Sequence, residues 1–239
     1  MRHLIVGAAG FGQEVAWALA CQLRTQGLRS DFAFFDDAVA AGPLPSGLGH
    51  VAGGLDVLGR YVESTRRGGD PLVRLVLGIG LPAVKEAVVA RLAPLGVPWA
   101  TVVHPAALVG PNVEIGPGAY VGAGAILTVN VRVGSWVTVN LHCQVAHDDV
   151  LEDFVTLHPD VHLSGNVTIG RASELGTGAI VTPGTTVGPG AVLGAGCVAV
   201  RALDGHRTYV GMPARALPGA AVAPDPERET RAAGMAESA

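Results

Sequence analysis

Two neighbouring residues, His147 and Asp148, have side chains that can move a proton together. Histidine exchanges a proton near neutral pH, and an adjacent carboxylate orients the imidazole ring and raises its basicity. A different chemistry starts from His142 and His147, because histidine side chains can serve as ligands to zinc. The residue types alone leave both possibilities open, so the elements that position these side chains must decide.

The segment around this pair is a repeat with a period of six. From Val103 to Leu193 every sixth residue is aliphatic, and four residues after each of these stands a small residue or a valine, with Asp149 as the exception. The aliphatic positions are Val103, Val109, Ile115, Val121, Leu127, Val133, Val139, Val145, Leu151, Leu157, Leu163, Ile169, Leu175, Val181, Val187 and Leu193. This period fits neither a helix nor an alternating strand. It predicts a short strand and a tight corner, repeated, with the glycines that often follow the aliphatic residue permitting the corner.

Three such units make one triangular coil of about 18 residues, and about five coils stack and bury each other's faces. In this phase His142 and His147 point outward near corners. Asp149 points inward, where a carboxylate must find partners. We interpret Asp149 as structural or as support for His147.

The first hundred residues have a different pattern, in which strands alternate with helices. Strands are expected at Arg2–Val6, Phe32–Phe35, Leu72–Leu77 and Trp99–Val103, and helices at about 13–26 and 82–95. This alternation predicts a small parallel α/β sheet.

The turn after the first of these strands is rich in glycine, with GxxGxG spacing over residues 7–12. Such a turn lets a phosphate approach a helix N-terminus. Asp36 and Asp37 follow the second strand, where a carboxylate often meets a ribose or sugar hydroxyl. A plain tight turn and a solvated loop remain the alternatives for these two features.

Composition bounds the class of protein. The chain has 239 residues, of which 49% are hydrophobic and 15% charged, and its mean hydropathy is +0.41, so a wholly disordered chain is excluded. We expect no membrane insertion, since no apolar run reaches about 18 residues. The net charge is −4 with no basic block, so we expect no nucleic-acid partner. Three scattered cysteines and no signal-peptide pattern favour the cytoplasm.

The two halves together resemble the hexapeptide-repeat sugar acyltransferases, the family of bacterial UDP-amino-sugar N-acetyltransferases and sialic acid O-acetyltransferases. The matching stretches include GAAGFGQEVA, FFDD, VNLHCQVAHD and YVGMPAR. The resemblance implies a Rossmann-like nucleotide-sugar-binding α/β domain at 1–100 and a left-handed parallel β-helix acyltransferase domain at 101–217. Residues 218–239, rich in Ala, Pro and Glu, are expected to be a disordered tail. Family members are typically homotrimers with sites between neighbouring prisms.

The resemblance also implies roles for single residues. His147, beside Asp148, is the expected general base for direct attack of a sugar amine on the thioester of acetyl-CoA, and no metal is expected. The expected acetyl-CoA contacts are Thr156, Thr177, Ala195, Gly211, Pro213 and Arg215. The expected acceptor contacts are Ala9, Gly10, Phe11, Asp36, Asp37, Gly80 and Asn140.

Three positions depart from the family pattern. Many amino-sugar members have histidine where Phe11 stands and asparagine where Leu81 stands, which leaves room for another acceptor. Well-known members carry histidine in place of Thr156, so the side chain expected to contact the pantetheine or acyl carbonyl differs in this chain.

Alternatives remain open. A sugar O-acetyltransferase would use the same base on a hydroxyl group. A zinc hydratase resembling the γ-carbonic anhydrases would use His142 and His147, but the third ligand should lie near 106, and His104 has a different phase. A non-catalytic protein would bind a nucleotide sugar without binding CoA. The sequence does not identify the acceptor or the length of the acyl chain.

Overall fold

The computed structural model describes residues 2–28, 32–67 and 73–221. They form two compact units, with the boundary between Val102 and Val103. No helix in these ranges combines the length and the apolarity that crossing a bilayer requires. Residues 222–239 of the expected tail lie outside the described residues. Residues 218–221 correct that expectation, because they belong to a strand.

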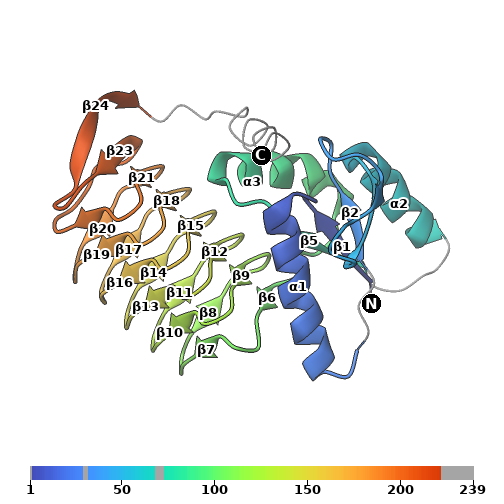
Figure 1. Cartoon of the computed structure of the whole chain (residues 1–239), viewed down its shortest axis with the longest axis horizontal. Helices are drawn as coiled ribbons and strands as arrows, with labels where there is room; N and C mark the ends of the chain where they lie inside the picture. Colours follow the sequence, from blue (N-terminus) through green and yellow to red (C-terminus); the bar gives the residue numbers. More distant parts are fainter. Residues whose placement is uncertain (1, 29–31, 68–72, 222–239) are drawn as a thin grey trace. The chain divides into compact units, whose positions relative to one another are not determined.

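The first unit is a five-stranded sheet with helices on both faces (Figure 1). Its strands are β1 (Arg2–Val6), β2 (Phe32–Phe35), β3 (Gly42–Pro43), β4 (Gly49–Gly53) and β5 (Val73–Leu77). Its helices are α1 (Gly10–Thr25), α2 (Leu55–Arg67) and α3 (Pro82–Leu92), followed by the 3-10 turn η1 (Ala93–Leu95). The strand order is β3-β4-β2-β1-β5, and all pairs except β3 with β4 are parallel. Right-handed crossovers put α1 on one face and α2 and α3 on the other.

The prediction of a small parallel sheet is confirmed, with two differences. The segment Trp99–Val103 is not one strand of this sheet. Trp99 makes a single parallel bridge to Leu75, and Val102–Val103 is already β6, the first strand of the second unit. Strand β4 and helix α2 were not predicted, although the buried residues Leu55, Leu58 and Val62 of α2 recur at helical spacing.

The second unit is a parallel β-helix whose strands are each two residues long (Figure 1). Its strands are β6 (Val102–Val103), β7 (Leu108–Val109), β8 (Glu114–Ile115), β9 (Tyr120–Val121), β10 (Ile126–Leu127), β11 (Arg132–Val133), β12 (Thr138–Val139), β13 (Gln144–Val145), β14 (Val150–Leu151), β15 (Thr156–Leu157), β16 (His162–Leu163), β17 (Thr168–Ile169), β18 (Glu174–Leu175), β19 (Ile180–Val181), β20 (Thr186–Val187), β21 (Val192–Leu193) and β22 (Val198–Ala199). A hairpin of β23 (Arg207–Val210) and β24 (Arg215–Ala221) follows.

The strands form three sheets, here called I, II and III. Sheet I contains β6 and every third strand to β21, then β23 and β24; sheet II runs from β7 to β22 and sheet III from β8 to β20. Partners are 18 residues apart, as in the pairs Leu127 with Val145 and Val145 with Leu163, which confirms the triangular coil. The aliphatic and small positions of the repeat fill the interior.

The corners differ from the expectation in one respect. The left-handed backbone falls on the third residue after the aliphatic one, as at Asn130, His142 and Asp148, and not on the glycine that directly follows it. That glycine serves close stacking instead: a Cβ on Gly110 would lie 1.7 Å from the carbonyl oxygen of Thr128 in the next coil. The glycines therefore belong to the repeat as predicted, but the predicted role of these glycines in the corner backbone was wrong.

Candidate active site

A histidine–carboxylate pair stands on the corner between sheets II and III, directly after β13. Nδ1 of His147 lies 2.8 Å from Oδ2 of Asp148. Both side chains are about half exposed, at 55% and 45%. Asp148 has a φ of 62°, in the left-handed region that Asp tolerates better than most residues. The hydrogen bond from His147, followed by one from Asn130, holds the pKa of the Asp148 carboxyl below its usual value.

An asparagine ladder supports this carboxylate from the preceding coils. Nδ2 of Asn130 donates to Oδ1 of Asp148 at 3.0 Å, and Nδ2 of Asn112 donates to Oδ1 of Asn130 at 2.9 Å. The three residues occupy the same corner position in successive coils, and all have positive φ. The sequence analysis missed this ladder, although the 18-residue spacing of 112, 130 and 148 could have revealed it.

The imidazole ring of His147 lies against Gly165 in the following coil. A Cβ on Gly165 would come within 2.9 Å of Nε2 and 3.0 Å of Cε1 of His147, so a larger residue there would have to displace the ring. Asn166 N also donates to the carbonyl oxygen of His147 at 2.9 Å. The corner at residues 164–167 therefore packs directly against the His147 ring and supports its position.

Asp149 is buried below the pair, as its phase in the repeat predicted. Its residue exposure is 0%, and Oδ1 accepts a hydrogen bond from Val167 N at 2.8 Å. Oδ2 has no hydrogen-bond partner. Burial raises the pKa of Asp149 to about 6, against the lowering effect of the backbone amides of Val167 and Ala146.

Four other predicted residues lie away from His147. Asn140, Thr177 and Ala195 stand on the corners between sheets I and II, and Thr156 is the first residue of β15 in sheet I. Thr177 and Ala195 are exposed, whereas Thr156 and Asn140 are buried, and Oδ1 of Asn140 accepts from Leu141 N at 2.7 Å. Within one chain the structure does not bring these residues to the His147 corner.

The predicted terminal motif forms the hairpin after the last coil. Gly211 and Pro213 are exposed in the turn between β23 and β24. Arg215 begins β24, and its Nη1 donates to the carbonyl oxygen of Ala214 at 3.0 Å while its side chain stays exposed. The guanidinium therefore keeps donors for an anion.

The predicted acceptor residues of the first unit gather at the carboxyl ends of its strands. Ala9, Gly10 and Phe11 follow β1, Asp36 follows β2 and Gly80 follows β5. A Cβ on Gly80 would lie 3.7 Å from the Phe11 ring, so those two loops adjoin. This edge of a parallel sheet is where ligands bind in open α/β folds.

The two aspartates after β2 hold backbone in place. Oδ2 of Asp36 accepts from Ala8 N at 2.7 Å, and its Oδ1 accepts from Ala38 N at 2.8 Å. Asp37 is turned to the other helices, where Oδ1 accepts from Leu55 N at 2.8 Å and Oδ2 pairs with Arg91 at 2.6 Å. Asp36 therefore shapes the glycine-rich loop, whereas Asp37 ties α2 and α3 to the sheet.

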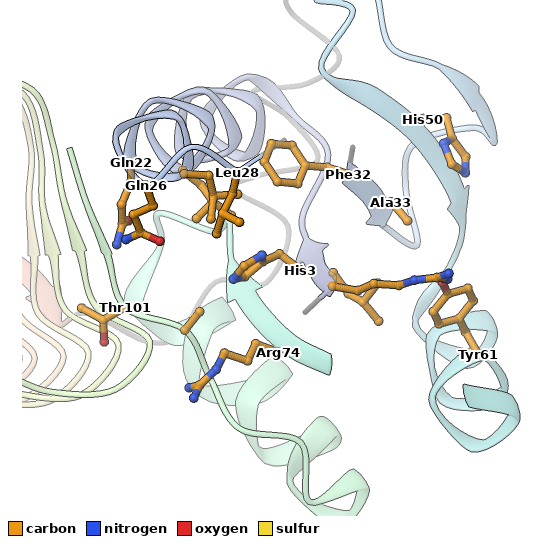
Figure 2. Close-up of a pocket in the computed structure, with 15 residues that line it drawn as sticks. His3, Gln22, Gln26, Leu28, Phe32, Ala33, His50, Tyr61, Arg74 and Thr101 are labelled. Carbon is orange, nitrogen blue, oxygen red and sulfur yellow. The ribbon is translucent and has the colours of Figure 1, made fainter. Parts of the chain in front are cut away.

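A pocket of about 840 Å³ lies at the opposite, amino-terminal edge of the same sheet (Figure 2). Figure 2 shows His3 at its centre, with Gln22 of α1 and Gln26, which follows that helix, on one side and Arg74 on the other. Burial, followed by the charges of the N-terminus and Arg74, lowers the pKa of His3. None of the predicted site residues lines this pocket, so it is separate from the loops described above.

The two histidines of the zinc-hydratase alternative do not share a corner in one chain. His142 precedes β13 and stands on the I–II corner, whereas His147 follows β13 on the II–III corner. Within residues 2–28, 32–67 and 73–221, no three His, Cys, Asp or Glu side chains are grouped so as to hold a metal ion.

A second histidine–carboxylate pair was not predicted. Nε2 of His158 lies 2.9 Å from Oε1 of Glu174, and the side chains are 33% and 17% exposed. His158 directly follows β15 and Glu174 begins β18, one coil on. Their separation of 16 residues falls outside the 18-residue period, so the repeat alone did not reveal them.

Comparison with known proteins finds solved acetyltransferase structures that are similar to this chain in sequence and in fold. The chain is 30% identical to the acetyltransferase domain of PglB from Neisseria gonorrhoeae FA1090, solved in complex with acetyl coenzyme A; the match covers 90% of this chain and 98% of that one, with a TM-score of 0.79. PerB from Caulobacter crescentus, solved with CoA and GDP-perosamine, is 29% identical over 91% of this chain and 97% of its own, with a TM-score of 0.76. No protein-family profile matches the chain.

A curated relative agrees with the solved structures. GDP-perosamine N-acetyltransferase of Escherichia coli O157:H7 is 27% identical over 183 residues, which are 74% of this chain and 76% of that protein. The fold and the sequence similarity to these relatives together assign the chain to the acetyltransferases that are built on a parallel β-helix. Within that class, the chain belongs to the hexapeptide-repeat sugar N-acetyltransferase family.

Proposed function

We propose that the protein transfers the acetyl group of acetyl-CoA to the amino group of a nucleotide-linked sugar, with His147 as general base. The observation that carries this assignment is the 2.8 Å pair of His147 Nδ1 and Asp148 Oδ2 on an exposed corner of the β-helix. The solved relatives hold acetyl coenzyme A in one case and CoA with GDP-perosamine in another.

The geometry assigns a role to each ring nitrogen. With Nδ1–H donated to Asp148, Nε2 carries the lone pair that accepts a proton. The sugar amine attacks the thioester carbonyl and Nε2 takes the amine proton. The C–S bond then breaks as the imidazolium passes that proton to the leaving sulfur, which gives an amide, the CoA thiol and neutral His147. Ionised Asp148 stabilises the imidazolium that forms, and no acyl-enzyme is needed.

The proposed reaction needs one binding site for the acceptor nucleotide sugar and one for acetyl-CoA. The acceptor nucleotide would contact Ala9, Gly10, Phe11, Asp36 and Gly80 at the carboxyl ends of the first sheet, where Phe11 and Leu81 provide no polar side chain to the acceptor. Acetyl-CoA would contact Thr177, Ala195 and the Gly211–Arg215 hairpin, with Thr156 and Asn140 near the reacting end. Arg215 would meet a CoA phosphate.

A homotrimer would complete the site. His147 and the predicted CoA contacts lie on different corners of one prism, so a neighbouring prism would bring the second set to the first. The outer face of sheet II supports such packing, because Leu108 is 64% exposed and Ile180 is 37% exposed. The three cysteines are free thiols, which suits the reducing cytoplasm.

The test is release of the CoA thiol from acetyl-CoA with a panel of nucleotide-linked amino sugars and hydroxy sugars. His147→Asn should reduce kcat at least about 100-fold, because it removes the base. His206→Asn is the matched control, since His206 is an exposed corner histidine whose ring also lies against a glycine, Gly190. Equal rates in wild type and His147→Asn would refute the assignment of the base.

The acceptor panel separates the remaining alternatives. Release with an amino sugar alone identifies N-transfer, and release with a hydroxy sugar alone identifies O-transfer with the same base. Binding of a nucleotide sugar with no binding of acetyl-CoA would support a non-catalytic protein instead.

A further inference from the structure

Asp149 breaks the pattern of the β-helix interior at the coil that carries His147. The equivalent positions in the neighbouring coils are Val131 and Val167, both fully buried, and Asp149 is buried to the same extent. A buried carboxylate loses its hydration and stabilises a fold only when protein groups replace the water. One of its oxygens has no hydrogen-bond partner, so stability alone does not explain a carboxylate at this position.

The hydrogen bond that Asp149 makes takes the place of a backbone bond that the next coil forms at the same corner. There, the equivalent amide, Thr185 N, donates to the carbonyl oxygen of Thr182 at 3.3 Å. At Val167 the amide donates to Oδ1 of Asp149 instead, at 2.8 Å. The carboxylate thus takes the place of the carbonyl oxygen of Ser164.

The corner that this bond holds has an unusual backbone. Gly165 has a φ of +98° and Asn166 a φ of 53°, so two consecutive residues are left-handed. At the equivalent corner of the preceding coil, His147 is not left-handed and Asp148 is the one residue of the pair with a positive φ. This changed corner puts Gly165 directly against the His147 ring, with Nε2 within 2.9 Å of where a Cβ would be.

We propose that Asp149 is a positioning residue for acetyl transfer: by accepting the amide of Val167 it holds the corner 164–167 in the form on which the His147 imidazole rests. The proposal rests on the proposed function, because His147 is the group it positions. Asp149 touches neither substrate and acts through the neighbouring coil.

The surroundings of Asp149 contain few competing charges. The titratable groups that act on it are His147 and Asp148 from its own corner. The corners packed above and below, residues 164–167 and 128–131, have no titratable side chain. His147 favours the ionised form of Asp149, and Asp148 opposes it.

The experiment compares Asp149→Val with Asp149→Asn. Valine restores the pattern of Val131 and Val167 but removes the acceptor, so kcat should fall about tenfold or more while both KM values stay within about twofold. Asparagine keeps an oxygen for Val167 N, so kcat should stay within about threefold of wild type. Wild-type kcat in folded Asp149→Val would overturn the proposal.

A matched control removes another buried polar group from the same interior. Ser173 is fully buried and its Oγ donates to the carbonyl oxygen of Gly188 at 2.9 Å, far along the chain from His147. Ser173→Val should leave kcat unchanged. A loss equal to that of Asp149→Val would mean that any such change loosens the prism, and so would overturn a specific role. If Asp149→Val does not fold, the Asp149→Asn variant tests the proposal. An asparagine variant that does not fold, or whose kcat is tenfold lower than that of wild type, also overturns it.

A structural readout separates this proposal from the function on which it rests. If the wild-type protein transfers no acetyl group to any acceptor, the proposed function fails. In that case the contact between the His147 ring and the Gly165 Hα, followed by NMR in selectively labelled protein, still tests the positioning. The contact should be present in wild type and absent in Asp149→Val, and its persistence in the variant would refute positioning by Asp149.

Discussion

Nδ1 of His147 lies 2.8 Å from Oδ2 of Asp148, its neighbour in the chain. Consecutive residues reach this geometry because Asp148 has a φ of 62°, which turns its carboxylate back toward the preceding ring. The corner of the β-helix thus creates a pair that a regular strand, with side chains on alternate faces, would separate.

Asp148→Asn tests this pair directly. Asparagine tolerates the left-handed backbone and keeps the shape of the side chain, but loses the charge that stabilises the imidazolium. We expect kcat to fall about tenfold to 100-fold with little change in KM for acetyl-CoA. Because its hydrogen bonds hold the pKa of Asp148 below its usual value, the carboxyl stays ionised across the assay range, so the fall of kcat/KM at acid pH in wild type should not arise from Asp148. An unchanged kcat would contradict the role of the pair.

Asn130→Gly tests the ladder that orients the carboxylate. Glycine adopts the φ of 57° without strain but removes the 3.0 Å hydrogen bond to Asp148. We expect kcat to fall about two- to fivefold, the effect of one lost hydrogen bond. Asn112→Gly makes the same change one coil earlier, where it does not touch Asp148, and should leave kcat unchanged. Equal effects of the two substitutions would mean that the ladder acts only on stability.

The sequence predicted the β-helix well because its period is set by the geometry of the coil. Every buried strand needs an aliphatic residue at the same phase, so the pattern recurs from Val103 to Leu193 and the phase placed Asp149 inside. The His158–Glu174 pair escaped prediction because its separation of 16 residues does not match the 18-residue coil. The role of Asp36 also escaped, because its hydrogen bond to Ala8 N joins two loops that the sequence analysis treated separately.

Asp36→Ala tests the shape of the glycine-rich loop. The substitution removes an acceptor for Ala8 N, Ala38 N and Val39 N, and Ala8 is buried. At about 1 kcal/mol for each bond, the free energy of unfolding should fall by roughly 2–3 kcal/mol. The KM for the nucleotide sugar should rise as the loop loosens.

Asp37→Ala is the contrasting variant for this test. Its ion pair with Arg91 is about half exposed on both sides, so loss of the pair should cost less than about 1 kcal/mol, and loss of the hydrogen bond from Leu55 N should cost about 1 kcal/mol more. Urea titrations of the two variants measure the difference. A larger loss of stability in Asp37→Ala than in Asp36→Ala would contradict this assignment.

The buried carboxyl of Asp149 predicts how stability depends on pH. Burial raises its pKa in the folded protein to about 6, above the usual 3.8, so the folded state binds the proton more tightly than the unfolded state. Stability from this group is therefore present below about pH 4 and is lost as pH rises through 6, by roughly 3 kcal/mol in total. Asp149→Asn should lack this loss, so the difference in urea midpoint between variant and wild type should grow from pH 4 to pH 7. A constant difference would contradict the raised pKa.

The thiol of Cys143 should not react with thiol reagents in the native protein. Its side chain is fully buried, its Sγ donates to the carbonyl oxygen of His158 at 3.1 Å, and burial raises its pKa to about 12. The thiolate is the reactive form, so almost none is present at pH 8. In labelling with a thiol-specific reagent followed by peptide mass analysis, we expect Cys143 to be modified only after denaturation, while the half-buried Cys21 reacts first. This outcome also means that free thiol measured during acetyl transfer reports CoA and not Cys143. Modification of Cys143 in the folded protein before Cys21 would contradict this prediction.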